Sequence, residues 1–167
     1  SFVRAAEEQK SIEQQKSGQY EGFLLGDDLR DLQDALCGEW TKDVVMLFGG
    51  KENVGKSALL CKIGYELITN NEDVVVIYHT IDDTREQLLP RFVCIAEKSR
   101  TLTQNMVRNP VYWNSLSERY PRCSNISPRR DKGYDKILSF GREGRLIIKD
   151  MNDGMSLAFI DNLIMYH

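Results

Sequence analysis

Residues 44–57 have the sequence VVMLFGGKENVGKS, and this stretch constrains the rest of the chain more than any other. Its first part, residues 44–48, is an uninterrupted apolar run, which is typical of a strand buried on both faces of a parallel sheet. Its second part, residues 50–57, fits the pattern G-x-x-x-x-G-K-[ST] at every required position. Residues 58–68 follow with helical periodicity. A strand, a glycine-rich loop and a helix in this order predict a phosphate-binding loop (P-loop).

Each required residue type of this loop has a chemical role toward a nucleoside triphosphate. Glycines let backbone N–H groups curl around the phosphates, and the start of the helix adds the positive end of its dipole. We expect Lys56 to reach the β- and γ-phosphates and Ser57 to offer its hydroxyl to a metal, Mg²⁺. The predicted ligands are therefore ATP and Mg²⁺, and the predicted nucleotide-binding residues are Gly50, Lys51, Glu52, Asn53, Val54, Gly55, Lys56 and Ser57.

Strand and helix patterns alternate along the rest of the chain. Residues 74–78 and 145–149 read as further strands, and residues 84–97 read as a helix. Residues 98–140 read as short helices broken by prolines 110, 121 and 128, and a turn at 150–154 leads to a last helix at about 156–166. This alternation predicts an α/β fold with a mostly parallel sheet and right-handed crossovers.

A second candidate site lies where the strand at 74–78 ends, at the sequence HTIDDT of residues 79–84. In such sheets the carboxyl ends of the strands face the ligand crevice. A carboxylate at Asp82 could orient or deprotonate the water that attacks the γ-phosphate, and Asp83 is the neighbouring alternative. Either residue could instead simply cap the helix that begins near Thr84. Lys56 and Asp82 are the predicted catalytic residues.

Two helices are predicted before the apolar run. Residues 2–16 read as a polar helix with a thin apolar stripe, which suits a linker or a contact with a partner subunit. Residues 27–37 read as a second helix with three leucines on one face, ended by Gly38. The predicted organisation is a linker helix at 1–20 and an α/β domain over 21–167.

Composition excludes several classes of protein. With 167 residues, 41% of them hydrophobic and 28% charged, the chain is sized for one domain with its own core, not for a disordered tail or a disulfide-stapled scaffold. No apolar run approaches the ~18 residues of a membrane span. The first residues have no apolar core of a secretory signal, and the four cysteines and two histidines show no zinc spacing. We expect a soluble, cytoplasmic protein with reduced thiols.

The net charge of −3 is unevenly distributed. Residues 85–149 carry fourteen basic and six acidic side chains, an excess of eight positive charges. Five aromatic residues lie among these cations: Tyr112, Trp113, Tyr120, Tyr134 and Phe140. Such a mixture can bind single-stranded DNA through phosphate neutralisation and base stacking, or it can be only a solvated helical face.

From about Gly22 to its end, the chain resembles the RecA-like ATPase domain of DnaB-type replicative helicases and their phage relatives. The P-loop block, and a short leucine-bearing helix before it, are similar to the family's pattern. Residues 80–88, TIDDTREQL, resemble the family block that reads Ser-Leu-Glu-Met and then Gln-Leu. The resemblance assigns the role of the family's water-activating glutamate to Asp82, which is one methylene shorter. Arg91 fits the basic residue that the family often carries later in that helix.

The resemblance implies an ATP-hydrolysing core of a hexameric ring that translocates on single-stranded DNA. In the family, the Walker B strand, the DNA-binding loops and the arginine finger come later than the segment that residue 167 matches. The resemblance therefore implies that residues 21–167 are the N-terminal part of a RecA-like ATPase domain, incomplete at its C-terminus, and these residues alone are expected to hydrolyse ATP weakly. Three alternatives share the P-loop: a RecA- or RadA-type recombinase or signalling ATPase, a small P-loop kinase, and a nucleotide-binding module without catalysis.

Overall fold

The computed structural model of the chain divides into two compact units, Ser1–Leu47 and Phe48–His167. The structure describes residues 22–36, 40–41, 44–99, 101–150, 152–154 and 156. The predicted helix at 2–16, and nearly all of the one at 156–166, lie outside these residues and stay predictions. Within the described ranges, no helix combines the length and the apolar character needed to cross a bilayer.

The first unit contains a short helical segment where the leucine spacing predicts one. A 3₁₀ turn, η1 (Asp27–Leu29), leads into helix α2 (Arg30–Ala35). The N–H of Leu25, a fully buried residue, donates to Gln33 Oε1 at 3.0 Å, so a side chain of α2 satisfies the backbone before the helix. The predicted helix at 27–37 is confirmed for residues 27–35, and its expected end at Gly38 lies outside the described residues.

The second unit is a mixed α/β arrangement, as the sequence predicts. After the P-loop come a helix and a strand, then a run of helical segments that ends with the long α7, and then the last strand. In order, the elements are α3 (Lys56–Asn70), β1 (Val76–His79), α4 (Arg85–Ala96), α5 (Gln104–Arg108), α6 (Pro110–Ser115), η2 (Pro121–Cys123), α7 (Ile126–Arg142) and β2 (Leu146–Lys149).

Strands β1 and β2 pair in parallel. Val76 lies opposite Leu146, and His79 lies opposite Lys149. All the helices from α4 to α7 lie between the two strands in the sequence, so the connection is a crossover and not a hairpin. The predicted strands at 74–78 and 145–149 are confirmed, each starting one or two residues later than expected.

The prediction of a buried strand at residues 44–48 is wrong for this structure. These residues adopt no strand, and the side chains of Val45 and Leu47 are 88% and 93% exposed. Among the described residues, the sheet consists of β1 and β2 only. An apolar run indicates burial but does not itself supply the neighbouring strand whose hydrogen bonds define a sheet, and here no such neighbour is paired with it.

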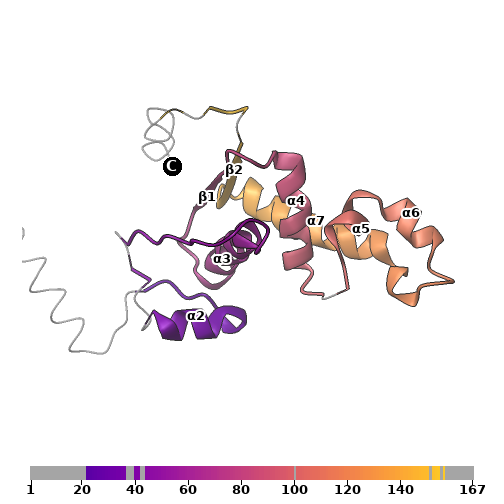
Figure 1. Cartoon of the computed structure of the whole chain (residues 1–167), viewed down its shortest axis with the longest axis horizontal. Coiled ribbons are helices and arrows are strands. Elements are labelled where there is room, and N and C mark those ends of the chain that lie inside the picture. Colours follow the sequence, from indigo (N-terminus) through magenta and orange to yellow (C-terminus); the bar gives the residue numbers. More distant parts are fainter. Residues whose placement is uncertain are drawn as a thin grey trace, which may run out of the picture. The chain divides into compact units, whose positions relative to one another are not determined.

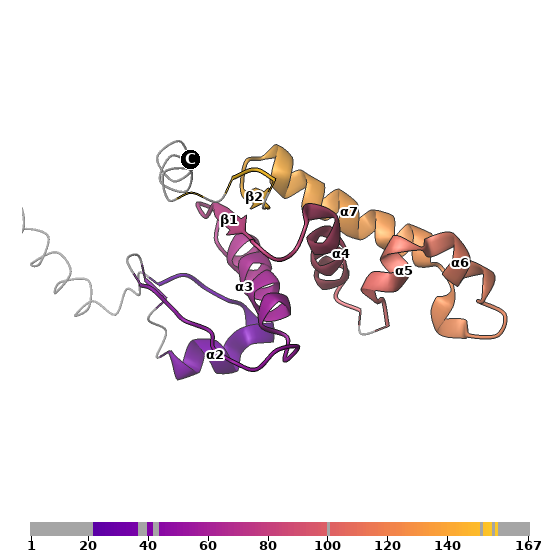
Figure 2. The same cartoon turned by 45° about the horizontal axis from the view of Figure 1, so that its top comes forward.

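The main core of the second unit lies between the helices and the sheet. Figures 1 and 2 show α7 running from β2 at one end to α5 and α6 at the other. A second cluster, formed by α4, α5, η2 and the start of α7, fills the far end. The buried residues of the main core are Cys61, Tyr65, Ile68, Leu88, Phe92, Ile137, Phe140 and Leu146.

The prolines of residues 98–140 start helices more than they break them. Pro110 is the first residue of α6, and Pro121 is the first residue of η2. Pro128 is the third residue of α7, where its missing N–H removes no intrahelical bond. The predicted short helices are therefore confirmed up to η2, whereas the break expected at Pro128 is replaced by one continuous helix over Ile126–Arg142.

Helices α4 and α7 approach each other closely at Gly133. A Cβ atom on Gly133 would lie 2.8 Å from Val93 Cγ1 and 2.9 Å from the Val93 carbonyl oxygen. Neither distance is compatible with a side chain, and the second involves backbone. Gly141, later on the same helix, has no atom within 4 Å of such a position. Only the first of these two glycines is therefore required by packing.

Residues at the two ends of β2 complete neighbouring helices. Arg145 Nη2 donates to the carbonyl oxygen of Ile68 at 2.6 Å and also to that of Asn71, at the end of α3. Asp150 Oδ2 accepts from the N–H of Arg85, the first residue of α4, at 2.9 Å. Groups that each helix leaves unpaired within itself are thus satisfied from a distant part of the sequence.

An ion pair joins α7 to the end of α4. Arg129 Nε donates to Glu97 Oε1 at 2.9 Å, and Arg129 Nη2 donates to Glu97 Oε2 at 3.2 Å. The arginine side chain is 23% exposed and the glutamate side chain 14%. These hydrogen bonds hold the pKa of the Glu97 carboxyl below its ordinary value.

We expect the Arg129–Glu97 ion pair to stabilise the fold at neutral pH and to lose this effect in acid. A carboxyl whose pKa is lower in the folded than in the unfolded chain stabilises the fold above its unfolded pKa, about 4, and this stabilisation is lost as the pH falls through the folded pKa. We expect Glu97→Gln to lower the thermal midpoint at neutral pH, and the two midpoints to converge between roughly pH 5 and pH 3. Thermal unfolding followed by circular dichroism measures this. A constant difference at every pH would contradict the prediction.

Candidate functional site

The glycine-rich loop turns sharply before α3. Gly55 precedes the helix with a φ of +95°, and Asn53 has a φ of 59°. Glycine adopts this left-handed region freely, and asparagine tolerates it. A Cβ on Gly50 would lie 3.0 Å from Val54 Cγ2, so the turn is also crowded at its first glycine. The residue types of the motif thus meet the needs of the backbone.

Lys56, the first residue of α3, folds its side chain back over this loop. Its Nζ donates to the carbonyl oxygen of Gly50 at 2.9 Å and to that of Lys51 at 2.8 Å. Two neutral acceptors hold the ammonium group, so its charge is not compensated by a carboxylate in these contacts. The result is a positioned cation in front of the helix.

The start of α3 presents further donors beside Lys56. The N–H groups of the first helical turn have no partner inside the helix, and the Leu59 N–H makes the first such bond, to the Gly55 carbonyl at 2.9 Å. A helix start with unpaired N–H groups and a positive dipole end is suited to an anion. A cavity of about 270 Å³ lies here, lined by Asn53, Gly55, Lys56, Ser57, Ala58, Arg91 and Gln104.

The predicted binding residues divide into two groups. Asn53, Gly55, Lys56 and Ser57 line this P-loop cavity. Lys51, Glu52 and Val54 are exposed, and Gly50 and Lys51 contribute main-chain oxygens that hold Lys56. The main-chain oxygens of Gly50 and Lys51 therefore shape the loop, whereas Asn53, Gly55, Lys56 and Ser57 form part of the cavity wall.

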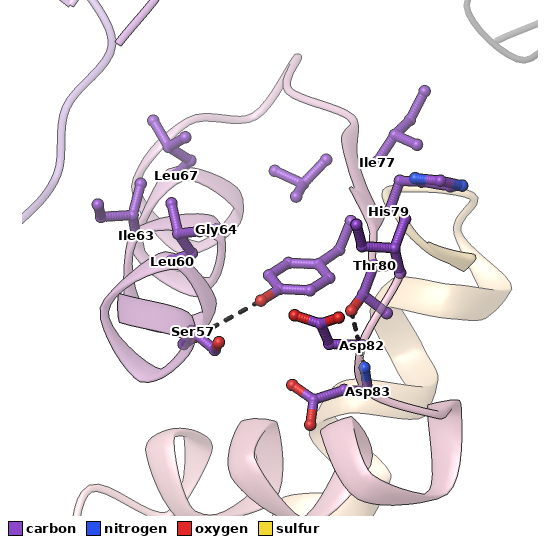
Figure 3. A pocket seen from close by; sticks show the side chains of 13 residues that line it. Ser57, Leu60, Ile63, Gly64, Leu67, Ile77, His79, Thr80, Asp82 and Asp83 are labelled. Atoms are coloured by element: carbon purple, nitrogen blue, oxygen red, sulfur yellow. Dashed lines mark hydrogen bonds between the residues drawn. The ribbon is translucent and has the colours of Figure 1, made fainter. Parts of the chain in front are cut away.

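Beyond β1 the chain bends and carries the two candidate carboxylates to a second cavity. The Asp83 N–H donates to Thr80 Oγ1 at 3.2 Å, which fixes the bend. This cavity, of about 420 Å³, lies between α3 and β1. Figure 3 shows Ser57 of α3 on one side of it, and Asp82 and Asp83 beyond the end of β1 on the other. Ser57 lines both cavities, so the structure brings the predicted metal ligand and both carboxylates together.

Tyr78 connects the strand to the P-loop helix across this second cavity. Its hydroxyl donates to the carbonyl oxygen of Ser57 at 3.5 Å, and its ring meets Phe92 edge-on at 5.7 Å. Burial raises the pKa of the Tyr78 hydroxyl well above its ordinary value. Burial also raises the pKa of the neighbouring Cys61 thiol. Both groups therefore stay neutral near pH 7.

Neither carboxylate caps α4, so the alternative that assigns Asp82 or Asp83 this role is wrong. Thr84 is the N-cap and forms a capping box with Gln87, whose Oε1 accepts from the Thr84 N–H at 2.9 Å. The next N–H, that of Arg85, donates to the Asp150 carboxylate. Hydrogen bonds from the Arg85 and Asn152 N–H groups lower the pKa of this carboxyl below its ordinary value.

The structure distinguishes the two carboxylates from each other. Asp83 forms a two-pronged ion pair with Arg91: Nη1 donates to Oδ2, and Nη2 donates to Oδ1 at 3.2 Å. Asp82 is exposed and lines the cavity. Because Arg91 neutralises Asp83, Asp82 is the better placed of the two to contact a water.

Besides Ala58, which directly follows the motif, sequence reasoning missed two residues that line the P-loop cavity. It noted Arg91 only through the family resemblance and gave it no role, and it gave no signal for Gln104 at the start of α5. Both come from elements that reach the loop by tertiary packing. A spacing rule within the motif cannot detect them.

Several basic side chains of residues 85–149 form ion pairs or hydrogen bonds within the second unit. The exposed aromatic side chains lie on α6 and after it, where Tyr112 is 61% and Tyr120 40% exposed. The guanidinium carbon of Arg119 lies 5.5 Å from the ring centroid of Tyr120. Among the described residues of this stretch, six arginines have acidic or carbonyl partners: Arg85, Arg91, Arg108, Arg129, Arg130 and Arg145.

The residues near the P-loop fit ATP with Mg²⁺. Unpaired N–H groups and Lys56 suit phosphate oxygens, and the Ser57 hydroxyl and the Asp82 carboxylate are hard oxygen donors on one cavity. Among the described residues no three His, Cys, Asp or Glu side chains form a metal cluster. A nucleotide-bound Mg²⁺ commonly uses only one or two protein oxygens together with phosphates and water.

Comparisons with known proteins add no relative to this picture. No family model, no curated protein and no solved structure matches the chain. The resemblance of its motifs to DnaB-type helicases therefore stays a prediction, and the functional assignment depends on the P-loop and the residues around it.

Proposed function

We propose that this chain binds Mg-ATP at the P-loop cavity and hydrolyses it. The observation that carries the proposal is the position of Lys56, whose ammonium group is held by two carbonyl oxygens of the loop at the start of α3. A cation, unpaired helix N–H groups and a hydroxyl residue on one cavity are the groups that a triphosphate with its metal requires.

The residues take separate roles in this proposal. Lys56 and the first N–H groups of α3 bind the phosphates and offset charge that develops during phosphoryl transfer. Ser57 supplies a hydroxyl to Mg²⁺, and Asp82 orients or deprotonates the attacking water from the opposite side of the second cavity. Mg²⁺ held there would supply positive charge that offsets the negative charge of the phosphates.

The finer proposal is the ATPase core of a DnaB-like hexameric helicase that translocates on single-stranded DNA. It is supported by the motif blocks at 50–57 and 80–88 and by the parallel pair of strands that follows the P-loop helix. The alternatives are a RecA- or RadA-type recombinase or signalling ATPase, a small P-loop kinase, and a nucleotide-binding module.

An ATPase assay with and without single-stranded DNA separates these functions. Stimulation by DNA supports a helicase or recombinase, and a strand-displacement assay then separates the two. ATP consumption that requires a small-molecule acceptor supports a kinase. Tight Mg-ATP binding with no turnover under single-turnover conditions supports a binding module. No binding of Mg-ATP at all would overturn the proposal.

We expect Asp82→Asn to lower hydrolysis at least about tenfold while leaving ATP affinity nearly unchanged, since the lost interaction belongs to the transition state. Single-turnover hydrolysis and equilibrium binding measure the two effects. Asp135→Asn, at an exposed position of α7, is the matched control and should change neither. Normal turnover in Asp82→Asn would exclude the catalytic role, and a larger loss in Asp83→Asn would move it to Asp83.

A further inference from the structure

The P-loop cavity contains a second cation besides Lys56. Arg91 lines the cavity together with Lys56 and Ser57, but it comes from the middle of α4. Its neighbours Leu88 and Phe92 are fully buried in the core that α4 shares with α3. The helix that carries the guanidinium is therefore positioned beside the loop by core packing.

Asp83 occupies this guanidinium in the present structure. The two side chains meet through two hydrogen bonds and are only 23% and 19% exposed. A planar guanidinium binds a carboxylate and a phosphate with the same two-pronged geometry. A phosphate group can therefore replace the carboxylate without a change in the kind of contact.

The charges around the cavity favour such an exchange when a triphosphate arrives. Lys56 and Arg91 are both positive and line the same small space, so without a ligand they repel each other unless one is neutralised. Asp83 supplies that neutralisation for Arg91. A bound triphosphate brings several negative charges, which attract the arginine and repel the aspartate.

We propose that Asp83 holds Arg91 until a nucleoside triphosphate binds, and that Arg91 then exchanges this carboxylate for the γ-phosphate. A diphosphate lacks that group and leaves Arg91 on Asp83, so the exchange makes the site distinguish triphosphate from diphosphate. It also releases Asp83 next to Asp82 at the end of β1. This inference rests on the proposed function, since it requires a triphosphate at the P-loop.

Calorimetric titration of the full chain with Mg-ADP and with a non-hydrolysable Mg-ATP analogue tests the exchange. Arg91→Ala is expected to lower the affinity for the ATP analogue roughly tenfold to a hundredfold, the range of a charged hydrogen-bonded contact. It should change the affinity for ADP by less than about twofold. Asp83→Asn removes the carboxylate that competes for Arg91 and should raise the affinity for the ATP analogue a few-fold. The double variant should behave like Arg91→Ala.

The Arg129–Glu97 pair provides the matched control. It is also two-pronged and its side chains are 23% and 14% exposed, but Arg129 is not among the residues that line the P-loop cavity. Arg129→Ala should lower the thermal midpoint and leave both nucleotide affinities unchanged. If Arg91 is only structural, Arg91→Ala will lower the midpoint and keep the ratio of ATP to ADP affinity, which would overturn the exchange.

Two further variants separate the possible failures. Arg91→Lys keeps the charge and the aliphatic stem but loses the two-pronged geometry of the guanidinium. It replaces Arg91→Ala in the test if that variant does not fold, and it should also weaken binding of the ATP analogue. If Lys56→Ala loses affinity for both nucleotides while the Arg91 variants keep their affinity for both, the proposed exchange is wrong and the proposed function stands. If Lys56→Ala loses neither nucleotide, the proposed function itself is wrong.

Discussion

Lys56→Ala is expected to reduce the affinity for Mg-ATP by about a hundredfold or more, which amounts to a loss of binding in ordinary assays. The ammonium group of Lys56 is fixed by the Gly50 and Lys51 carbonyl oxygens at the start of α3, so its removal takes away a charge that needs no rearrangement to meet a phosphate. Calorimetry with Mg-ATP and with Mg-ADP measures the loss, and both nucleotides should be affected.

Lys132→Ala is the control for this variant. Lys132 is exposed on α7 and does not line the P-loop cavity, so its replacement removes the same charge from the chain without touching the site. Its nucleotide affinity should stay within about twofold of the parent. Equal affinities in the Lys56 and Lys132 variants would show that the loop is a glycine-rich turn without a ligand.

Gly133→Ala is expected to destabilise the second unit by about 1–3 kcal/mol, the usual cost of overpacking a core. The added methyl group would meet Val93 Cγ1 at 2.8 Å and the Val93 carbonyl oxygen at 2.9 Å, so α4 and α7 would have to separate. Both helices contribute to the main core, which spreads the cost beyond the contact itself. Chemical denaturation gives the change in the free energy of unfolding.

The same substitution at Gly141 should act in the opposite direction. Nothing lies within 4 Å of a Cβ at this position of α7, and alanine in a helix is favoured over glycine by about 0.5–1 kcal/mol. The pair of variants separates the helix preference of alanine from the contact with Val93. Similar changes in stability for the two would show that α4 and α7 do not meet closely at Gly133.

The parts of the fold that the sequence predicts well are those set by neighbouring residues. The spacing within residues 50–57 requires a tight turn and a helix start, and the structure has both at Gly55 and Lys56. The strands at 74–78 and 145–149 and the helix at 84–97 are also found, because each is an apolar pattern bounded by clear turn residues.

The parts that it predicts poorly depend on distant partners. The run at 44–48 has the composition of a buried strand, yet whether it forms one depends on a neighbour that its own residues do not specify. The helix start near Thr84 suggested an aspartate cap, whereas Gln87 and Asp150 satisfy it. The pairing of Asp83 with Arg91 likewise requires the bend after β1 and the first turns of α4 together.

Strand β2 contributes more to the second unit than its place in the sheet. Arg145, before it, donates to a carbonyl oxygen in the last turn of α3, and Asp150, after it, accepts from the first N–H of α4. The ends of both helices that flank β1 in the sequence therefore depend on a segment far along the chain. Bringing such distant residues together costs loop-closure entropy before any contact compensates it. The docking of β2 therefore completes both helices at once, and a nascent chain cannot make these contacts before Asp150 has emerged from the ribosome.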